Sequence, residues 1–478
     1  MDERKSQILG FVRNQLTQSE TLLKTLTFDT HGRKLLYRNV YQTLSTYINT
    51  FIEKRTEPRW LAIAGLRGVG KTTLLAQLYT NLQLESIKKL YIPLDQAQDL
   101  GFSLSEILTV YEELLGTSFE RLDTPIFLFL DEVQYQKTWA VTIKTLFDRS
   151  RNVFIIATGS SALSLQVNAD SARRMVLEKL YPLGFSEYIY AKFQKTLPEG
   201  LGERIQQALF FSSNEQEVYK KLQKETSNVN TFWTGIDRFE VEKYYKYGSL
   251  PFALNVDNER IIYQQLQQII DYIISKDVTQ INAFDKATLN KLSQLLYAVA
   301  GADIVSIPKL AATLGIDPKT VIQALDTLEK TEVLLRIYPY GAHYSQVKKP
   351  SKYLFTSSSY RAMYYNLVGS VEQYDHYKGK LLEDVAGMYL FQAFGGNSGV
   401  SITYDSAEKG ADFILSTNHM KEKIVLEIGA GQKNSEQAAA TLQKVGGKYG
   451  LIISQTELSL RVDTNCVSVP LEYFLLIR

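Results

Sequence analysis

A chain of 478 residues suggests about three domains, and its 45% hydrophobic and 22% charged residues are typical of an ordinary folded protein. The formal net charge of +2 does not indicate a nucleic-acid partner for the chain as a whole, so any basic surface must be local. The single cysteine, Cys466, excludes an intramolecular disulfide and a zinc site with several cysteines. The charged first residues and the lack of a membrane-length apolar run favour a cytoplasmic protein.

Residues 1–57 have the periodicity of amphipathic helices. Apolar residues recur at three- and four-residue steps from Ile8 onward, and again from about Leu36 to Phe51. We expect these N-terminal helices to pack as a scaffold on the domain that follows, without a catalytic role.

Residues 65–73 have the pattern of a phosphate-binding loop, G-x-x-x-x-G-K-[ST]. The apolar run 60–64 predicts a buried strand before the loop, and residues 74–79 predict a helix after it, which is the context that the motif requires. The glycines let backbone N–H groups surround a phosphate, and the helix start adds the positive end of its dipole. The expected nucleotide-binding residues are Gly65, Gly68, Val69, Gly70, Lys71, Thr72 and Thr73.

The loop and a later acidic pair together predict ATP and Mg²⁺ chemistry. Lys71 is expected on the β- and γ-phosphate oxygens, and Thr72 on the metal. Asp131 ends the apolar strand 125–130 and is expected to contact the same Mg²⁺, while Glu132 is expected to polarise the attacking water as general base. The alternative is a strand that ends in two solvated acids. No Asn-Lys-x-Asp tetrapeptide follows a strand, which favours ATP over GTP.

Strands and helices alternate between residues 58 and 195, with further apolar strands expected at 90–95 and 153–158. This alternation predicts an α/β domain with a parallel sheet and helices on both faces. Ligands of such sheets bind at the carboxyl ends of the strands. Ser160 or Thr158, at the end of one strand, could sense the γ-phosphate or hold the water, or could form only a polar turn.

Two arginines, Arg173 and Arg174, precede an expected last strand at 175–177. An arginine there could stabilise charge on the transferred phosphoryl group, within the chain or from a neighbouring subunit of a homo-oligomer. The alternative is a pair of surface arginines.

Four segments in this order resemble the archaeal-type P-loop ATPases, which are related to the AAA+ and STAND NTPases. These segments are 65–72, 128–134, 157–163 and 180–188, and residues 245–251 are similar to the Gly-Gly-x-Pro turn of that family. The resemblance spans nearly the whole chain after residue 55. It implies an ATPase core joined to a winged helix and to a nuclease-like domain of the restriction-endonuclease type. The expected domains are 1–57 N-terminal helices, 58–195 ATPase core, 196–287 helical lid, 288–345 winged helix, 346–375 linker and 376–478 restriction-endonuclease-like domain.

The third helix of the expected winged helix begins after Asp317 and is nearly neutral. Its charged and polar residues are Lys319, Gln323, Lys330, Asp326 and Glu329. Phosphate contact needs clustered cations, so DNA contact and a packing or protein-docking role both remain open. Three lysines after the wing, Lys348, Lys349 and Lys352, could touch a phosphate backbone or merely solubilise the loop.

The family pattern of the terminal domain places an acid, then Glu-x-Lys, around a metal-bound water. Asp412 and Glu427 match this pattern, and Glu383 lies on the preceding helix, but Gly429 stands at the lysine position. Lys433 could substitute if its loop folds back. Without that cation we expect weak cleavage of nucleic acid or none, and a structural or nucleic-acid-holding domain.

The sequence therefore predicts an ATP- and Mg²⁺-dependent switch that hydrolyses ATP and acts on or near DNA or RNA, in genome maintenance, mobile-element or defence work. The alternative is a STAND-like signalling ATPase whose winged helix and terminal domain bind protein partners without nuclease activity. No membrane partner is expected in either case.

Overall fold

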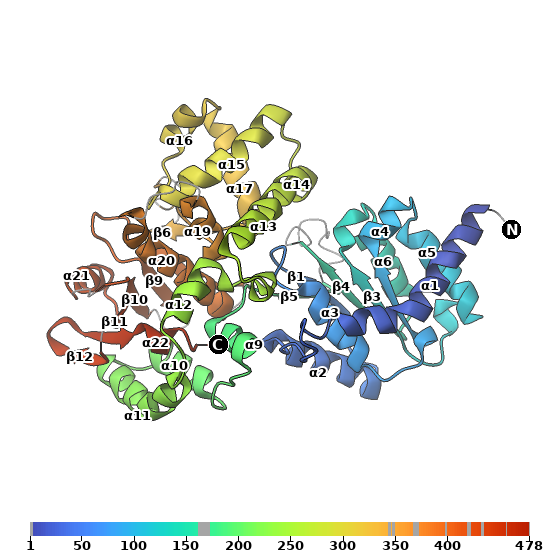
Figure 1. The fold of residues 1–478 in the computed structure, drawn as a ribbon, viewed down its shortest axis with the longest axis horizontal. Coiled ribbons are helices and arrows are strands. Elements are labelled where there is room, and N and C mark those ends of the chain that lie inside the picture. Colours follow the sequence, from blue (N-terminus) through green and yellow to red (C-terminus); the bar gives the residue numbers. More distant parts are fainter. Residues whose placement is uncertain are drawn as a thin grey trace. The chain divides into compact units, whose positions relative to one another are not determined.

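The computed structural model describes residues 3–160, 173–342, 346, 349–366, 372–396, 399–417, 422–431, 435–455 and 457–477. The chain divides into two compact units, Met1–Leu180 and Tyr181–Arg478. Each unit has its own sheet, one of five strands and one of eight (Figure 1).

The first unit contains a fully parallel sheet in the order β2-β3-β4-β1-β5. Its strands are β1 (Trp60–Ala64), β2 (Lys89–Pro93), β3 (Ile126–Asp131), β4 (Val153–Gly159) and β5 (Val176–Lys179). Every residue of β1 to β4 is buried, as expected for apolar strands covered on both faces. The predicted α/β fold with a parallel sheet is confirmed.

Helices cover this sheet, and the N-terminal helices contribute to its core. They are α1 (Glu3–Thr25), α2 (Asn39–Lys54), α3 (Lys71–Asn81), α4 (Leu94–Asp99), α5 (Leu104–Leu115) and α6 (Trp139–Arg149). Ile8 and Val12 of α1 belong to the same apolar cluster as Trp60, while Phe51 of α2 packs on the rings of Phe127 and Phe154. The N-terminal helices thus pack on the core, as the sequence predicted.

The strand register brings the chemically important strand ends to one edge. Ala64 of β1 lies opposite Gly159 of β4 and Lys179 of β5, and Asp131 of β3 lies opposite Pro93 of β2. Because all five strands run in the same direction, the segments after β1, β3 and β4 leave the sheet on the same side.

The second unit contains helices along its whole length. They are α9 (Phe185–Phe193), α10 (Leu201–Phe210), α11 (Glu215–Trp233), α12 (Phe239–Lys243), α13 (Glu259–Tyr272), α14 (Val278–Ile281), α15 (Lys286–Gly301), α16 (Ile307–Leu314), α17 (Pro318–Lys330), α19 (Ser358–Asn366), α20 (Glu372–Phe394), α21 (Glu436–Val445) and α22 (Leu471–Phe474). The expected start of α17 is confirmed: the Asp317 side chain accepts a hydrogen bond from Lys319 N at 2.7 Å, with Pro318 in the first turn.

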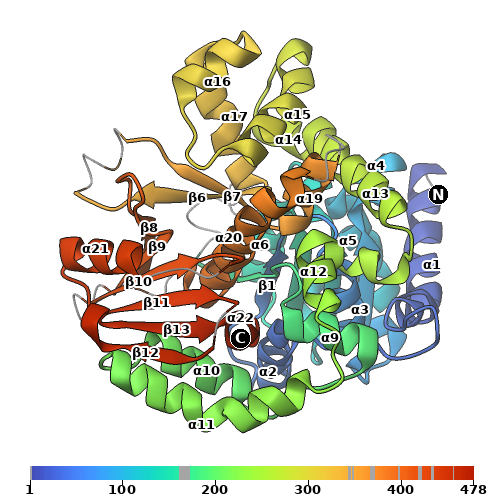
Figure 2. The same ribbon diagram turned by 60° about the vertical axis from the view of Figure 1, so that its left-hand side comes forward.

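The second sheet has the order β12-β13-β11-β10-β9-β8-β6-β7. Its strands are β6 (Leu334–Pro339), β7 (Lys352–Phe355), β8 (Val400–Tyr404), β9 (Phe413–Thr417), β10 (Lys423–Ile428), β11 (Tyr449–Ser454), β12 (Ser459–Arg461) and β13 (Cys466–Pro470). β8, β9 and β10 form an antiparallel meander, and β11 and β13 then continue parallel to β10. Helix α11 packs along β12 and β13 (Figure 2).

The expected linker at 346–375 is wrong for the part of it that the structure describes. Lys352–Phe355 is a buried strand, and the first seven residues of α19 are all buried. The expected wing is not separate from the terminal sheet either, because β6 pairs with β7 and also runs parallel to β8, with Tyr338 opposite Thr403. The short apolar run Tyr353–Phe355, flanked by serines, gave too little signal in sequence for a core strand.

Candidate nucleotide-binding site

The phosphate loop connects β1 to α3 and is shaped by its glycines. Gly68 and Gly70 have φ values of 88° and 97°, a backbone region that L side chains rarely adopt. A Cβ atom at Gly65 would lie 2.4 Å from the carbonyl oxygen of Leu180. The Lys71 side chain is buried and curls over the loop, where its Nζ donates to the carbonyl oxygens of Gly65 (3.0 Å) and Leu66 (3.3 Å).

Asp131 and Thr72, which are 59 residues apart in sequence, meet beside the loop. Thr72 Oγ1 donates to Asp131 Oδ2 at 2.9 Å, Tyr91 Oη donates to the same oxygen at 3.1 Å, and Thr158 Oγ1 donates to Oδ1. Burial raises the pKa of the Asp131 carboxyl, as does the charge of Glu132, whereas the hydroxyl donors lower it. Among the described residues, these donors to the buried carboxylate are neutral hydroxyl groups, and such a carboxylate is a favourable position for a cation.

Glu132 is held in a constrained conformation directly after β3. Its φ of 55° places it in the left-handed region, and its N–H donates to Thr158 Oγ1 at 3.2 Å. The carboxylate accepts a hydrogen bond from Gln134 Nε2 and lies 3.9 Å from Arg67 Nη2. Both contacts are to Glu132 Oε2, so a residue of the phosphate loop and a residue after β3 orient the same oxygen of this carboxylate.

Ser160 lies at the end of β4, close to the same acids. Its N–H donates to Gln134 Oε1 at 3.3 Å, so Gln134 bridges Glu132 and the end of β4. The Ser160 hydroxyl is buried and has no hydrogen-bond partner among residues with a described position. Both predicted sensor residues, Thr158 and Ser160, are thus close to the acidic pair, and Thr158 is the one in direct contact with it.

Arg173 and Arg174 are not at this edge of the sheet. They precede β5, which runs parallel to β1, so they lie at the amino ends of the strands, whereas the phosphate loop follows the carboxyl end. Arg174 forms an ion pair with Asp148 of α6, at 2.9 Å. A role on the phosphoryl group of the same chain is therefore wrong for both arginines. A role in a neighbouring subunit stays a prediction.

We expect Arg174→Ala to leave ATP turnover by dilute, monomeric protein unchanged. The variant loses the partly exposed ion pair with Asp148, and such a pair is worth about 0–1 kcal/mol in the free energy of unfolding. Turnover measured across a concentration series checks this. A tenfold or larger fall in kcat only at concentrations where the protein self-associates would assign Arg174 to the site of a neighbouring subunit. A fall at every concentration would contradict the position of Arg174 away from the phosphate loop of its own chain.

Arg38, Tyr91 and Gln134 were not found by sequence reasoning. Arg38, directly before α2, is buried and donates from Nη1 to the carbonyl oxygen of Val69 at 3.2 Å, so it supports the phosphate loop from outside the motif. Tyr91 lies on the strand next to β3. Only Gln134, two residues after Glu132, had a sequence signal, namely its place in the segment 128–134.

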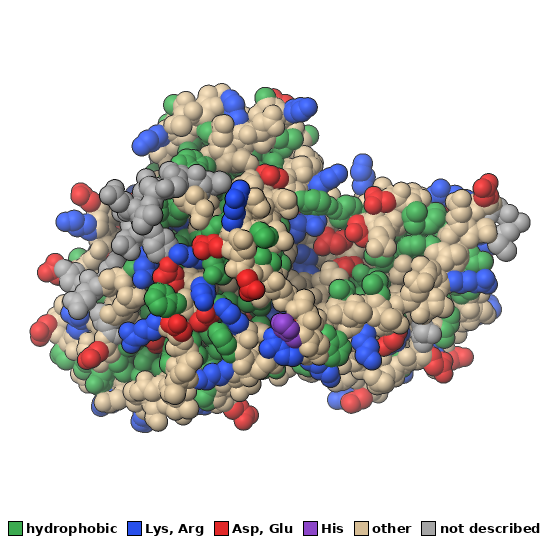
Figure 3. Space-filling view, in the orientation of Figure 1, with side chains coloured by type: hydrophobic (Ala, Val, Ile, Leu, Met, Phe, Trp, Pro, Cys, Tyr) green, Lys and Arg blue, Asp and Glu red, His purple; other side chains and the backbone are tan. Residues whose placement is uncertain are grey.

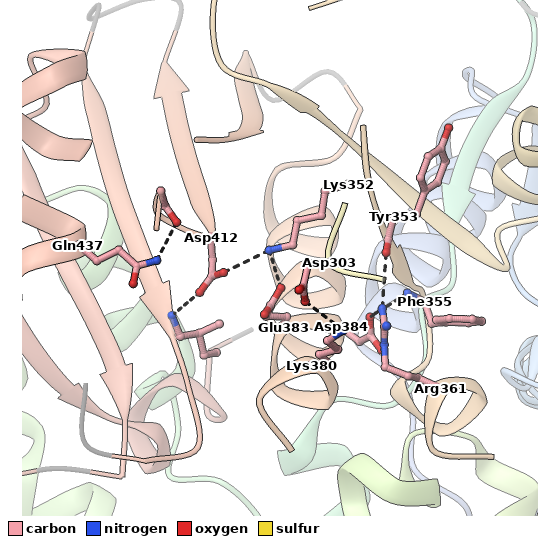
Figure 4. A network of polar contacts seen from close by, with 12 residues as sticks. Asp303, Lys352, Tyr353, Phe355, Arg361, Lys380, Glu383, Asp384, Asp412 and Gln437 are labelled. Carbon is pink, nitrogen blue, oxygen red and sulfur yellow. Dashed lines mark hydrogen bonds and ion pairs between the residues drawn. The ribbon is translucent and has the colours of Figure 1, made fainter. Parts of the chain in front are cut away.

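The residues expected at the terminal-domain site are brought together in part. Glu383 comes from α20, Asp412 directly precedes β9, and Glu427 is on β10 and fully buried. Lys433 lies outside the described residues. Lys352, expected on a loop, is instead buried at the start of β7 and contacts Glu383 and Asp412 (Figure 4).

Comparison with known proteins agrees with the geometry of the first unit. A family model described as an AAA domain matches residues 57–189, and one described as a domain of unknown function (DUF8612) matches residues 238–367. The residues that match an AAA domain therefore include the phosphate loop and the acidic pair.

The chain is 36% identical over 441 residues to the uncharacterized protein MJ1637 of Methanocaldococcus jannaschii, covering 91% of this chain and 88% of that protein. It belongs to the same family as that protein. An uncharacterized protein of Haemophilus influenzae is 23% identical over 66% of this chain and 71% of its own length.

Solved structures similar to this chain include two proteins with low TM-scores. The Aeropyrum pernix ORC1 protein in complex with DNA is 11% identical, covers 70% of this chain and 94% of its own, and has a TM-score of 0.29. AMPPCP-bound DnaA from Aquifex aeolicus is 16% identical, covers 62% and 89%, and has a TM-score of 0.27. At such scores the likeness carries no conclusion about function. In the described part of the chain, no helix has the length and apolar character that a membrane span requires.

Proposed function

We propose that this protein binds Mg·ATP and hydrolyses it as a conformational switch. The observation that carries the proposal is the 2.9 Å hydrogen bond between the Thr72 hydroxyl and the Asp131 carboxylate. This hydrogen bond joins the phosphate loop to the end of β3. In sequence, Lys71 directly precedes Thr72, and Glu132 directly follows Asp131.

The residues present fit a magnesium ion. Mg²⁺ takes oxygen ligands and keeps several of its waters, so one hydroxyl and one carboxylate are sufficient protein ligands. Thr72 and Asp131 would hold the ion, which when bound neutralises phosphate charge. Lys71 would release the carbonyl oxygens of Gly65 and Leu66 and bind the β- and γ-phosphate oxygens of ATP.

Glu132 is the proposed general base. Gln134 and Arg67 hold its carboxylate on the phosphate-loop side of β3, where it would accept a proton from the attacking water. The buried Ser160 hydroxyl, at the end of β4, is a group that would hold the water or the γ-phosphate. Thr158 would act as a positioning residue through Asp131.

A nucleic-acid partner is the first candidate for the target of the switch. The order of α15, α16, α17 and the hairpin β6–β7 supports a winged helix, and the meander β8–β9–β10 followed by parallel β11 supports a restriction-endonuclease-like domain. On the face of the second unit seen in Figure 3, lysine and arginine side chains alternate with acidic ones. A nucleic acid would therefore meet local cations rather than a broad basic surface.

A protein partner is the second candidate, and one observation on α17 favours it. Ile322 is 44% exposed on this helix. Arg336 of the neighbouring strand pairs with Asp326 of α17 at 2.9 Å, which leaves this cation less available to phosphates. An exposed apolar residue on a nearly neutral helix suits docking to a protein better than reading of DNA.

We expect ATP turnover to rise severalfold when DNA or RNA is added, and the rise to shrink as salt increases, because phosphate contacts release counterions. Steady-state ATPase assays with double-stranded DNA, single-stranded DNA and RNA at two salt concentrations measure this effect. Heparin serves as a control for polyanions in general. Turnover that is the same under all these conditions would favour the protein-docking alternative.

A further inference from the structure

A buried lysine lies between two acids of the terminal-domain site. Lys352 Nζ is 2.5 Å from Glu383 Oε2 and 3.2 Å from Asp412 Oδ1 (Figure 4). It also faces the Phe413 ring, at 5.4 Å from the centroid. The Lys352 side chain is only 8% exposed. The ammonium group is therefore enclosed by two carboxylates and an aromatic face, which all favour a cation.

The strand register places the third acid beside these two. Phe413 lies opposite Leu426 in the antiparallel pair β9–β10, so one step further Asp412 stands opposite Glu427, on the same face of the sheet. Asp412 Oδ2 accepts a hydrogen bond from Ile428 N at 3.0 Å, which fixes the carboxylate against β10. Two of the three acids of the expected nuclease pattern, Glu383 and Asp412, thus contact the Lys352 ammonium, and the register places the third, Glu427, next to Asp412.

A divalent metal does not fit this arrangement. Mg²⁺ or Mn²⁺ needs a nearly complete shell of oxygen ligands. Here one oxygen of Glu383 and one of Asp412 bind the ammonium, the other Asp412 oxygen binds a backbone N–H, and the Phe413 ring offers no oxygen. Where positions are described, no group of three or more His, Cys, Asp or Glu side chains is arranged to hold a metal.

The charge on Lys352 is stable despite its burial. Burial lowers the pKa of the ammonium, but Glu383 and Asp412 raise it, and the net result lies above the ordinary value for lysine.

We propose that the Lys352 ammonium takes the place of the divalent cation, so that the terminal domain is a module that does not cleave nucleic acid. Gly429 removes the lysine of the family pattern, and a lysine from another strand, β7, forms ion pairs with Glu383 and Asp412 instead. The proposal does not depend on ATP hydrolysis by the first unit. It does rest on the proposed likeness to restriction endonucleases, because that likeness is the reason to expect a divalent metal among these acids.

The test counts Mn²⁺ ions bound by the full-length protein without nucleotide, from the electron paramagnetic resonance signal of free Mn²⁺. Wild type and Asp412→Asn should bind the same number, because the Lys352 ammonium already occupies the position between Glu383 and Asp412. Any ion at Thr72 and Asp131 is common to both proteins and cancels. One more Mn²⁺ on wild type than on Asp412→Asn would overturn the proposal.

Removing the ammonium should create the metal site. We expect Lys352→Met to bind one additional Mn²⁺, to gain thermal stability from Mn²⁺, and to lose both effects in Lys352→Met/Asp412→Asn. Lys378→Met, a change on α20 outside the site, should behave as wild type. A folded Lys352→Met protein without the additional ion would contradict the proposal. If this variant does not fold, the comparison of wild type with Asp412→Asn still decides.

Nuclease assays distinguish the proposal from a catalytic role for Lys352. Wild type should leave DNA and RNA uncut with Mg²⁺ or Mn²⁺. Metal-dependent cleavage that is lost in both Asp412→Asn and Lys352→Met would overturn the proposal. It would show that Lys352 is a catalytic residue of a nuclease. ATPase activity should be equal in all these proteins, so that failure here and failure of the ATPase proposal can be told apart.

Discussion

Lys71→Ala is expected to abolish tight ATP binding and turnover. The Lys71 ammonium is the buried cation proposed to bind the β- and γ-phosphates, and its position beside Gly65 and Leu66 keeps it within the phosphate loop. Two hydrogen bonds to charged groups contribute roughly 1.5–3 kcal/mol each, so the dissociation constant should rise by about 10²-fold or more. Isothermal titration calorimetry with ATP and Mg²⁺ measures this change.

A matched control is available on the surface of the same unit. Lys88→Ala removes a lysine whose ion pair with Glu85 is exposed, and it should leave ATP affinity and turnover unchanged. Undiminished affinity in folded Lys71→Ala protein would show that the loop does not bind nucleotide as proposed.

Glu132→Gln should retain ATP binding and slow hydrolysis by roughly 10²-fold or more, the effect expected on losing a general base. The amide has nearly the shape of the carboxylate, and its oxygen can still accept the hydrogen bond from Gln134. It cannot accept a proton from water. Single-turnover hydrolysis of bound ATP isolates this step from binding and product release.

The control for Glu132→Gln is Glu85→Gln, which changes a carboxylate that is 75% exposed and should leave the single-turnover rate as in wild type. ATP affinity should be preserved in both proteins. A single-turnover rate for Glu132→Gln equal to that of wild type would remove this residue from the chemical step.

The parts of the site that could be predicted are those encoded within a few residues. The phosphate loop needs its glycines, Lys71 and Thr72 at fixed spacing between a strand and a helix, and all of these are visible in sequence. Asp131 and Glu132 could be predicted because they end a continuously apolar run. That Thr72 and Asp131 touch follows from the parallel sheet, since both follow carboxyl ends of strands at one edge.

The supporting residues could not be predicted, because their contacts depend on tertiary packing. Arg38 reaches Val69 across 31 positions of sequence, and Tyr91 reaches Asp131 across 40. Nothing in the residues around Arg38 distinguishes it from other arginines of amphipathic helices. Lys352 is a similar case: a lysine beside a turn is usually solvated, and only the fold places it between two buried acids.

Two expectations failed for reasons that lie in chain direction and burial. A role of Arg173 or Arg174 on the phosphates of the same chain fails because residues that precede a parallel strand lie at the opposite edge from those that follow one. The expected linker 346–375 fails because much of its described part is buried. Its buried polar residues include Ser351, Ser357, Ser358, Ser359 and Arg361. Arg361 forms an ion pair with Asp384.

The pairing of β6 with β8 constrains how this family can change over evolutionary time. Residues 376–478 alone would leave β8 as an unpaired edge strand, and an unpaired edge strand can pair with strands of other molecules. The hairpin and the terminal strands must therefore be inherited as one piece. Gene fusions that exchange the terminal segment between relatives should have their junctions before residue 334 rather than at residue 376.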